Sequence, residues 1–175
     1  TIWIWPTGLF PRRILYYLRA KHITPSHLNS RNIHLIPVTL NSSGNLVTKE
    51  GFEERPAGMS LPCMCIEHAD GTTTWVHESL AIVAWLEEVF PGEGCEDIMG
   101  STIEQRARTR DILSVLGDAI VWGNCALIHS DPSTSSWSGL TPSAQSATTA
   151  IDANKRFHNL LSKIEAWCEK DVVQG

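Results

Sequence analysis

The sequence lacks a long apolar run and a large excess of charge of one sign. Uninterrupted apolar runs such as Leu80–Leu86 are far shorter than the ~20 residues that span a bilayer, and no signal sequence opens the chain. Fourteen Lys and Arg residues stand against 19 Asp and Glu residues, a formal net charge of -5, with no basic tract. We therefore expect a protein that does not span a membrane, is not secreted and has no general affinity for nucleic acid.

Cysteine is sparse and scattered. The five cysteines include one Cys-X-Cys pair, Cys63 and Cys65, but no Cys-X-X-Cys motif and no paired zinc spacing. We interpret them as reduced thiols of a cytoplasmic protein. Cys63 and Cys65 share one face of a predicted strand and are expected to be buried structural thiols. His68 and His77, at opposite ends of a predicted hairpin, are interpreted as surface residues, and no metal site is expected.

The composition is globular, and its distribution indicates two parts. Of 175 residues, 42% are hydrophobic and 19% are charged, which suits one ordinary domain or two small ones. Residues 91–101 are rich in glycine and acidic side chains, a pattern typical of a linker. We predict an α/β domain over 1–90, the linker over 91–101 and an all-helical domain over 102–175. Because the chain starts at Thr1 rather than Met and its last helix has no partner after it, we expect unnatural termini and a helical domain incomplete at its C-terminus.

Strand and helix signals alternate in the first 90 residues. β-branched and aromatic runs predict strands, helical spacing of apolar residues predicts helices, and Pro and Gly mark their ends. The expected elements are a strand over 1–5, a helix from Pro11 to near His22, a strand over 33–40, a short irregular helix over 48–55, a hairpin over 61–67 and 72–76, and a helix over 80–89. This order is βαβαββα. Pro37 is expected at a sheet edge or a bulge because it has no amide donor.

After the linker the strand signals disappear. Ser101 and Thr102 can cap a helix that carries an apolar stripe. Residues 131–146 are rich in Ser, Thr and Pro and are predicted to form a long loop. Apolar residues between Phe157 and Trp167 mark a last helix.

The motifs with chemical meaning gather between residues 55 and 90. Glu78 and Ser79 stand at a predicted helix start, where backbone amides and the positive dipole end favour a bound carboxylate. The charge of Glu78 adds a partner for an ammonium group, so the pair suits an α-amino acid. Leu61 precedes Pro62 at a strand start, where an outward-facing backbone pair can bind a peptide. Each feature alone also fits an ordinary cap or strand start; their combination points to a ligand site.

The order of these motifs resembles that of the soluble glutathione transferases. That family has Asn-Pro-x-Gly, a hydrophobic residue before a cis-proline, Asp-Gly, and Glu-Ser-x-Ala-Ile-x-x-Tyr-Leu in a thioredoxin-like N-terminal domain. The chain has Arg55-Pro56-Ala57-Gly58, Leu61-Pro62, Asp70-Gly71 and Glu78-Ser79-Leu80-Ala81-Ile82, then Trp85-Leu86. Phe10-Pro11-Arg12-Arg13-Ile14 is similar to the family's Pro-x-Arg run. The resemblance covers residues 2–92 and is weaker beyond them.

The resemblance implies the glutathione transferase architecture, a thioredoxin-like domain followed by an all-helical domain, with glutathione as co-substrate. Pro62 would be the cis-proline, and the backbone of Leu61 would pair with the cysteinyl unit of glutathione. Glu78 and Ser79 would hold the γ-glutamyl end. Family members are commonly cytoplasmic homodimers, and we expect the same here.

A second substrate, a hydrophobic electrophile, would bind in an apolar cleft between the domains. On the first domain the candidates are Leu9 and Phe10, and on the second they are Arg106, Arg110 and Ser114. An arginine there would suit an acidic or phenolic substrate, although the spacing is also that of an ordinary helix surface.

The chain departs from the family pattern where the thiol-activating group should lie. Family activity needs a hydroxyl or thiol just after the first strand to stabilise the glutathione thiolate. Here the usual serine position falls on Gly8, with Thr7 before it. Thr7 is the candidate catalytic donor and the Gly8 amide is the alternative, while Thr7 as a simple turn residue fits equally well. A second departure is one extra residue between Gly58 and Leu61.

Two functions from different classes follow. The first is a glutathione transferase that activates the thiol for conjugation, isomerisation or reductive cleavage, in detoxification or in a biosynthetic pathway. The second is a binding or scaffold protein with the same fold and no catalysis, which the missing serine, tyrosine or cysteine favours. A thioredoxin-like oxidoreductase is disfavoured because the first loop holds no cysteine.

Overall fold

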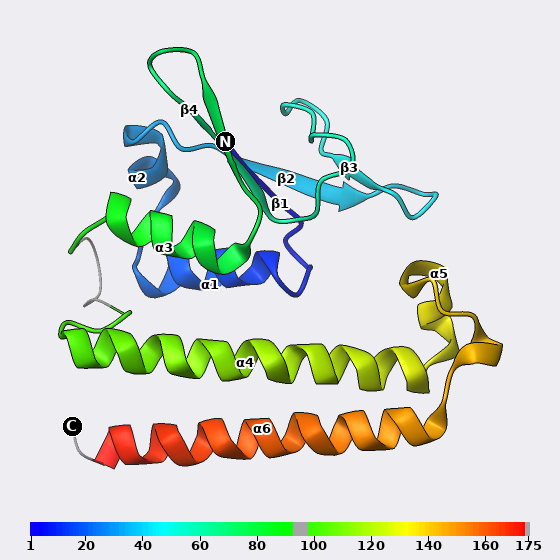
Figure 1. Cartoon of the computed structure of the whole chain (residues 1–175). Coiled ribbons are helices and arrows are strands. Elements are labelled where there is room, and N and C mark those ends of the chain that lie inside the picture. Colours follow the sequence, from blue (N-terminus) through cyan, green and yellow to red (C-terminus); the bar gives the residue numbers. More distant parts are fainter. Residues whose placement is uncertain (93–97, 174–175) are drawn as a thin grey trace. The chain divides into compact units, whose positions relative to one another are not determined.

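The computed structural model describes residues 1–92 and 98–173 and divides the chain into two compact units, 1–98 and 99–175 (Figure 1). The first unit is α/β and the second is helical. The middle of the predicted linker, residues 93–97, lies outside the described residues.

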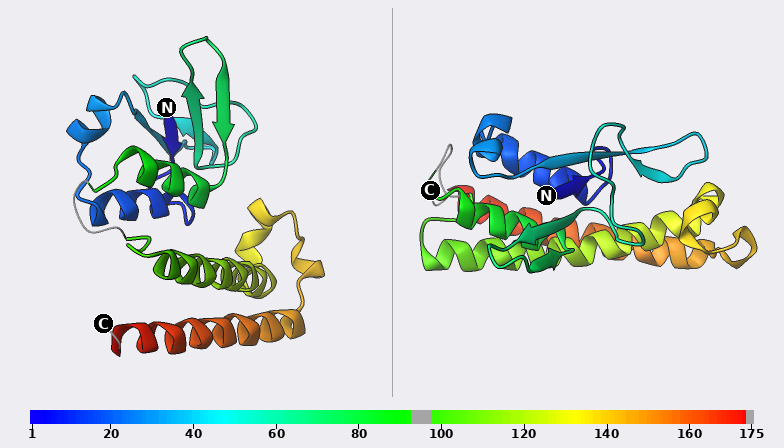
Figure 2. Two further views of the ribbon diagram at one scale, coloured as in Figure 1. Left: turned by 60° about the vertical axis from the view of Figure 1, so that its left-hand side comes forward. Right: turned by 90° about the horizontal axis from the view of Figure 1, so that it is seen from above.

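A mixed five-stranded sheet forms the centre of the first unit. Its strands are β1 (Ile2–Ile4), β2 (Leu35–Leu40), β3 (Leu46–Thr48), β4 (Cys63–Glu67) and β5 (Thr73–Val76), in the spatial order β3-β2-β1-β4-β5. β1 and β2 are parallel, and the other neighbours are antiparallel. The helices are α1 (Pro11–Ala20), α2 (Pro25–Ser30) and α3 (Ser79–Val89). In both figures α1 and α3 lie side by side on one face of this sheet (Figures 1 and 2).

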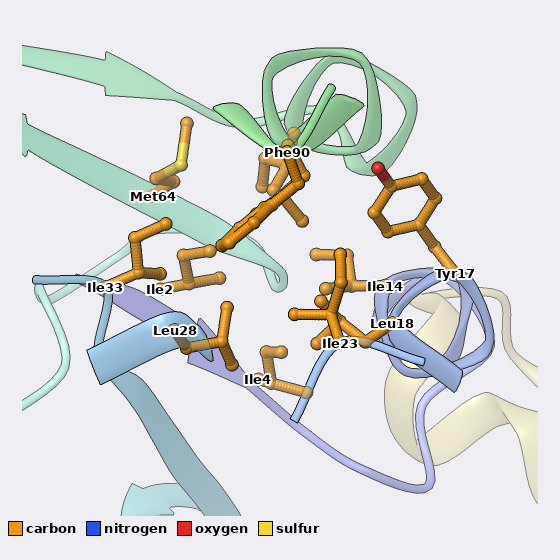
Figure 3. Close-up of a cluster of buried hydrophobic side chains, with 12 residues drawn as sticks. Ile2, Ile4, Ile14, Tyr17, Leu18, Ile23, Leu28, Ile33, Met64 and Phe90 are labelled. Carbon is orange, nitrogen blue, oxygen red and sulfur yellow. The ribbon is translucent and has the colours of Figure 1, made fainter. Parts of the chain in front are cut away.

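Alternation along the strands divides the apolar residues between two cores. Ile2, Ile4 and Met64 face α1 and α3, where they pack with Ile14, Phe90 and other side chains (Figure 3). The opposite face carries Trp3 with Cys63, Cys65, Ile36 and Val38. There the rings of Trp3 and Trp75 stack with centroids 5.9 Å apart, and the Trp3 indole donates to the Glu53 carbonyl at 3.1 Å.

The element order differs from the predicted βαβαββα. Two helices, α1 and α2, lie between the first two strands, and the irregular helix expected over 48–55 is absent. Instead, β2 turns back into β3 through Asn41, whose side-chain oxygen accepts the amides of Ser43 and Asn45. Gly51 then adopts a φ of 87°, which reverses the chain and is incompatible with a helix.

Pro37 was expected at an edge or a bulge, and this expectation was wrong. The residue lies in β2, an interior strand, opposite Ile4 at the end of the β1–β2 pairing. Pairing with β3 starts at the next residue, Val38, and the Pro37 carbonyl accepts the Lys49 amide at 3.0 Å. An interior strand therefore tolerates the missing donor because the proline lies where one neighbour ends and the other begins.

The second unit is built on two long helices, α4 (Ile103–Ser130) and α6 (Ala147–Val173), which run antiparallel (Figure 1). Thr102 caps α4 with Gln105 in a capping box. The predicted loop over 131–146 contains three short helices, Pro132–Thr134, α5 (Ser135–Ser138) and Pro142–Ala144. Gln145 ties this segment to α4 by donating to the carbonyls of Ile128 and Asp131.

Helix α4 is long and apolar enough to cross a bilayer when only length and composition are considered. The apolar character of α4 does not show as one uninterrupted apolar run in the sequence, because single polar residues such as Asp118 and Asn124 interrupt it. In the second unit α4 packs against α6, with Gly123 of α4 next to the Phe157 ring.

Candidate functional site

The predicted ligand-binding residues lie at one edge of the sheet, the edge at which β1 ends and β4 begins. The β4–β5 ladder ends where Met64 pairs with Val76, so the Leu61–Pro62 segment before β4 and the Glu78–Ser79 segment after β5 both follow the same end of this ladder. The β1–β4 ladder pairs Trp3 with Cys63, so the loop after β1 lies at the end of the sheet where β4 begins. The loop that carries Thr7, the Leu61–Pro62 segment and the start of α3 thus share this edge.

The Leu61–Pro62 peptide bond is cis, as the resemblance implies for this position. Pro62 is buried and Leu61 is partly buried. No residue in the described part of the chain forms a hydrogen bond with the amide or the carbonyl of Leu61. An extended ligand can therefore pair with this backbone as an additional strand.

Glu78 and Ser79 begin α3 as the sequence predicts. Glu78 is the N-cap residue, with a φ of -94° and a ψ of 129°, and no side chain caps the helix. The first-turn amides of α3 therefore remain available as donors for a carboxylate. Glu78 is exposed, whereas Ser79 is only 3% exposed.

Arg13 is a site residue that sequence reasoning missed. Its Nη1 donates to the Ser79 hydroxyl at 3.2 Å, and its guanidinium lies over the Phe10 ring, 5.2 Å from the centroid. Burial lowers the pKa of Arg13, and the nearby Glu78 carboxylate counters this effect. The Pro-x-Arg run was visible in the sequence, but the choice of Arg13 over Arg12 depends on the rotation of α1 against α3.

The two helices run parallel, and both start at this edge. Arg13 near the start of α1 contacts Ser79 at the start of α3, while Lys21 after the end of α1 contacts Glu87 near the end of α3. The positive dipole ends of both helices and the Arg13 charge therefore reinforce one another at the site, with the Glu78 carboxylate beside them. This arrangement offers separate partners to a carboxylate and to an ammonium group.

The two candidate donors after the first strand differ in availability. Thr7 is exposed in the turn between β1 and α1. The Gly8 amide donates to the Trp5 carbonyl at 3.0 Å, so the alternative in which this amide stabilises a thiolate is not supported by the structure. A Cβ atom on Gly8 would lie 2.8 Å from Trp5 Cε3 and 3.1 Å from Pro11 Cδ, so the family's serine cannot be accommodated there without a shift.

The residues predicted for the second substrate lie on both units. Leu9 is 50% exposed and Phe10 is 40% exposed, both just before α1. On α4, Arg106 donates to the carbonyls of Gly100 and Ser101, a role at the helix start that the cleft hypothesis did not foresee. Arg110 and Ser114 are exposed one and two turns further along α4. A shared cleft stays a prediction.

Four of the cysteines and histidines, Cys63, Cys65, His68 and His77, have the burial that the sequence predicts. Cys63 and Cys65 are buried on the Trp3 face, and burial raises the pKa of each thiol. His68 and His77 are exposed. Among the side chains that the structure describes, in residues 1–92 and 98–169, no three of His, Cys, Asp or Glu are close enough together to hold a metal ion.

A pocket of about 390 Å³ opens at the opposite edge of the sheet. It lies beside the amino end of β1, the segment before β2 and the last residues of β4, and its lining includes Asn32, His34, Glu67 and Trp85. None of the predicted site residues lines it, so this pocket and the Leu61–Ser79 edge are separate places.

No family model, no curated protein and no solved structure matches the chain. The functional assignment therefore rests on the residues of the site and on the motif resemblance.

Proposed function

We propose that the protein is a glutathione transferase, in which the first unit binds glutathione and activates its thiol for attack on a hydrophobic electrophile. The observation that carries the proposal is the unpaired backbone of Leu61, which precedes β4 at the same edge of the sheet at which Ser79 starts α3. One edge thus combines a strand-pairing surface with an amino acid binding surface. A short peptide with an α-amino acid end requires this combination.

The binding mode follows from the charges. The α-carboxylate of the γ-glutamyl end accepts from the first-turn amides of α3 and from Ser79, and the Arg13 charge strengthens that attraction. The ammonium group of the same end pairs with the exposed Glu78 carboxylate. The cysteinyl unit pairs with the backbone of Leu61, which directs its thiol toward the loop after β1.

The chemistry starts with a lowered thiol pKa. A hydroxyl donor close to the sulfur favours the thiolate, and exposed Thr7 is the donor that we assign to this role. The thiolate then attacks a hydrophobic electrophile, for which exposed Leu9 and Phe10 are the candidate contacts on the first unit. Conjugation, isomerisation and reductive cleavage share this first step, and the site is compatible with all three reactions.

The proposed architecture is a thioredoxin-like domain followed by an all-helical domain in a cytoplasmic homodimer. Parallel β1 and β2 with helices between them, and an antiparallel β4–β5 hairpin followed by α3, support the thioredoxin-like assignment. The replacement of the predicted second helix by β3 is the main departure from it.

The alternative is a glutathione-binding or scaffold protein without catalysis. It is favoured by the crowding around Gly8, which leaves no room for a side chain, and by the engagement of the Gly8 amide with Trp5. Both hypotheses share the binding site and differ only in the fate of the thiol.

A measurement of enzymatic turnover distinguishes the transferase hypothesis from the scaffold hypothesis. Wild-type protein and Thr7→Val are each titrated with glutathione calorimetrically and then assayed with a panel of aromatic and unsaturated electrophiles. The enzyme hypothesis predicts turnover by wild type and a large loss of rate in Thr7→Val with little change in affinity. Binding without turnover on any electrophile supports the scaffold, and absence of binding contradicts both.

A further inference from the structure

A polar seam joins α1 to α3 in the first unit. It is formed by Arg13 and Tyr17 of α1, by Lys21 just after the end of α1, and by Ser79 and Glu87 of α3. Arg13, Tyr17 and Lys21 are spaced about one helical turn apart and share one side of α1. Arg13 contacts Ser79, whereas Tyr17 and Lys21 both contact Glu87, about two turns further along α3. The two helices are therefore hydrogen-bonded at both ends of the seam.

At the end of the seam away from the ligand site, the side chains of Lys21 and Glu87 are largely shielded from solvent. The Lys21 side chain is 0% exposed, and that of Glu87 is 17% exposed. Lys21 Nζ lies 2.9 Å from Glu87 Oε1, and the Tyr17 hydroxyl donates to Glu87 Oε2 at 2.6 Å, so both carboxylate oxygens are engaged. Figure 3 shows the Tyr17 ring at the margin of the apolar cluster, with its oxygen next to α3.

A buried charged pair of this kind restricts the register of the two helices. Sliding α1 by one turn, about 5.4 Å, would separate Lys21 from Glu87 and leave a charge buried without its partner. In one direction the same slide would set Tyr17, not Arg13, opposite Ser79. Apolar side chains between the helices tolerate such shifts better than a charged pair does.

We infer that Tyr17, Lys21 and Glu87 are positioning residues, which fix the register of α1 along α3 so that Arg13 reaches Ser79. They do not touch the ligand site, and their effect on it passes through the two helices. The inference goes beyond the proposed glutathione function and depends on it only for the binding measurement described next.

The test replaces the charged pair by apolar side chains of similar size in Lys21→Met/Glu87→Leu. Such replacements are often neutral or stabilising for the fold, which separates positioning from stability. Three quantities are measured: the unfolding midpoint, the glutathione dissociation constant, and the Arg13 Nη1 to Ser79 Oγ distance in a crystal structure. The control, Asp152→Asn/Arg156→Gln, removes an exposed ion pair on α6.

Positioning predicts an unfolding midpoint near that of wild type, loss of the Arg13–Ser79 contact and a dissociation constant raised about tenfold, as expected for one charged hydrogen bond lost. The control changes none of these. A retained 3.2 Å contact with unchanged affinity would overturn the inference, since the pair would then be only structural.

The inference can still be tested if glutathione does not bind or if the double variant does not fold. If wild type does not bind glutathione, the proposed function fails, and the Arg13–Ser79 distance alone decides: loss of the contact supports positioning and its retention refutes it. If the double variant does not fold, Tyr17→Phe replaces it, because this change removes one hydroxyl and leaves Lys21 paired with Glu87. A weakened Arg13–Ser79 contact in Tyr17→Phe then supports the inference, and an unaltered one contradicts it.

Discussion

Arg13 on α1 donates a hydrogen bond to Ser79 on α3 across 3.2 Å, which joins the starts of two parallel helices. The contact concentrates positive charge where α3 has no side-chain cap. Ser79 is buried, whereas its neighbour Glu78 is exposed. The proposed carboxylate site is built on this relationship.

Removing the Arg13 charge should weaken ligand binding more than stability. In Arg13→Met the α3 amides lose a neighbouring cation, and hydrogen bonds to charged groups contribute about 1.5–3 kcal/mol, so the glutathione dissociation constant should rise about tenfold or more. Isothermal titration calorimetry measures the change. Arg12→Met, at the exposed neighbouring position, is the matched control and should bind like wild type. Equal losses in both variants would show that general charge, not the Arg13 contact, attracts the ligand.

Replacing Gly8 by the serine that glutathione transferases have at this position should not create activity. In Gly8→Ser the new Cβ would lie 2.8 Å from Trp5 Cε3, and overpacking of this kind costs about 1–3 kcal/mol. We expect a lower unfolding midpoint and no gain in transferase activity. Thermal unfolding followed by circular dichroism provides the measurement. A stable and more active Gly8→Ser would mean that the loop after β1 is looser than described.

Helix packing in the second unit depends on Gly123. A Cβ there would lie 3.2 Å from the Phe157 ring, whereas a Cβ on Gly117 would meet nothing within 4 Å. Gly123→Val should therefore destabilise the helix pair by about 1–3 kcal/mol. Gly117→Val, on the same helix, should leave stability nearly unchanged. Denaturant unfolding of both variants tests this, and equal effects would contradict the close approach of α4 and α6.

Alkaline pH should destabilise the first unit through Cys63. Burial raises the pKa of this thiol above its ordinary value of 9.0, so the folded state favours the neutral form. The stabilisation is fully present below pH 9.0 and is lost as the pH rises through the higher folded-state pKa. The unfolding free energy of wild type should consequently fall more steeply above pH 9.0 than that of Cys63→Ala. Parallel pH profiles for the two proteins would refute burial of the thiol.

Local signals allowed much of the site edge to be predicted. Strand β1, the β4–β5 hairpin and the start of α3 each have β-branched runs, an Asp-Gly turn or helical spacing of their own. The cis bond before Pro62 agrees with the motif order. These features depend on neighbours in the sequence, which is why sequence reasoning reached them.

The missed features depend on contacts between distant residues or on unusual local signals. Strand β3 has only three residues and exists through its pairing with β2. Helix α2 starts with a capping box in which His27 takes the place usually held by Glu or Gln. Arg13–Ser79 and Lys21–Glu87 each join residues separated by 66 positions, and no periodicity within one helix predicts them.

A nuclear magnetic resonance titration that follows backbone amide chemical shifts shows where glutathione binds. We predict saturable shifts concentrated at Leu61, at Ser79 and the next residues of α3, and near Thr7, with smaller effects elsewhere. Absence of shifts, or shifts confined to the opposite pocket around His34 and Glu67, would contradict the proposed glutathione site.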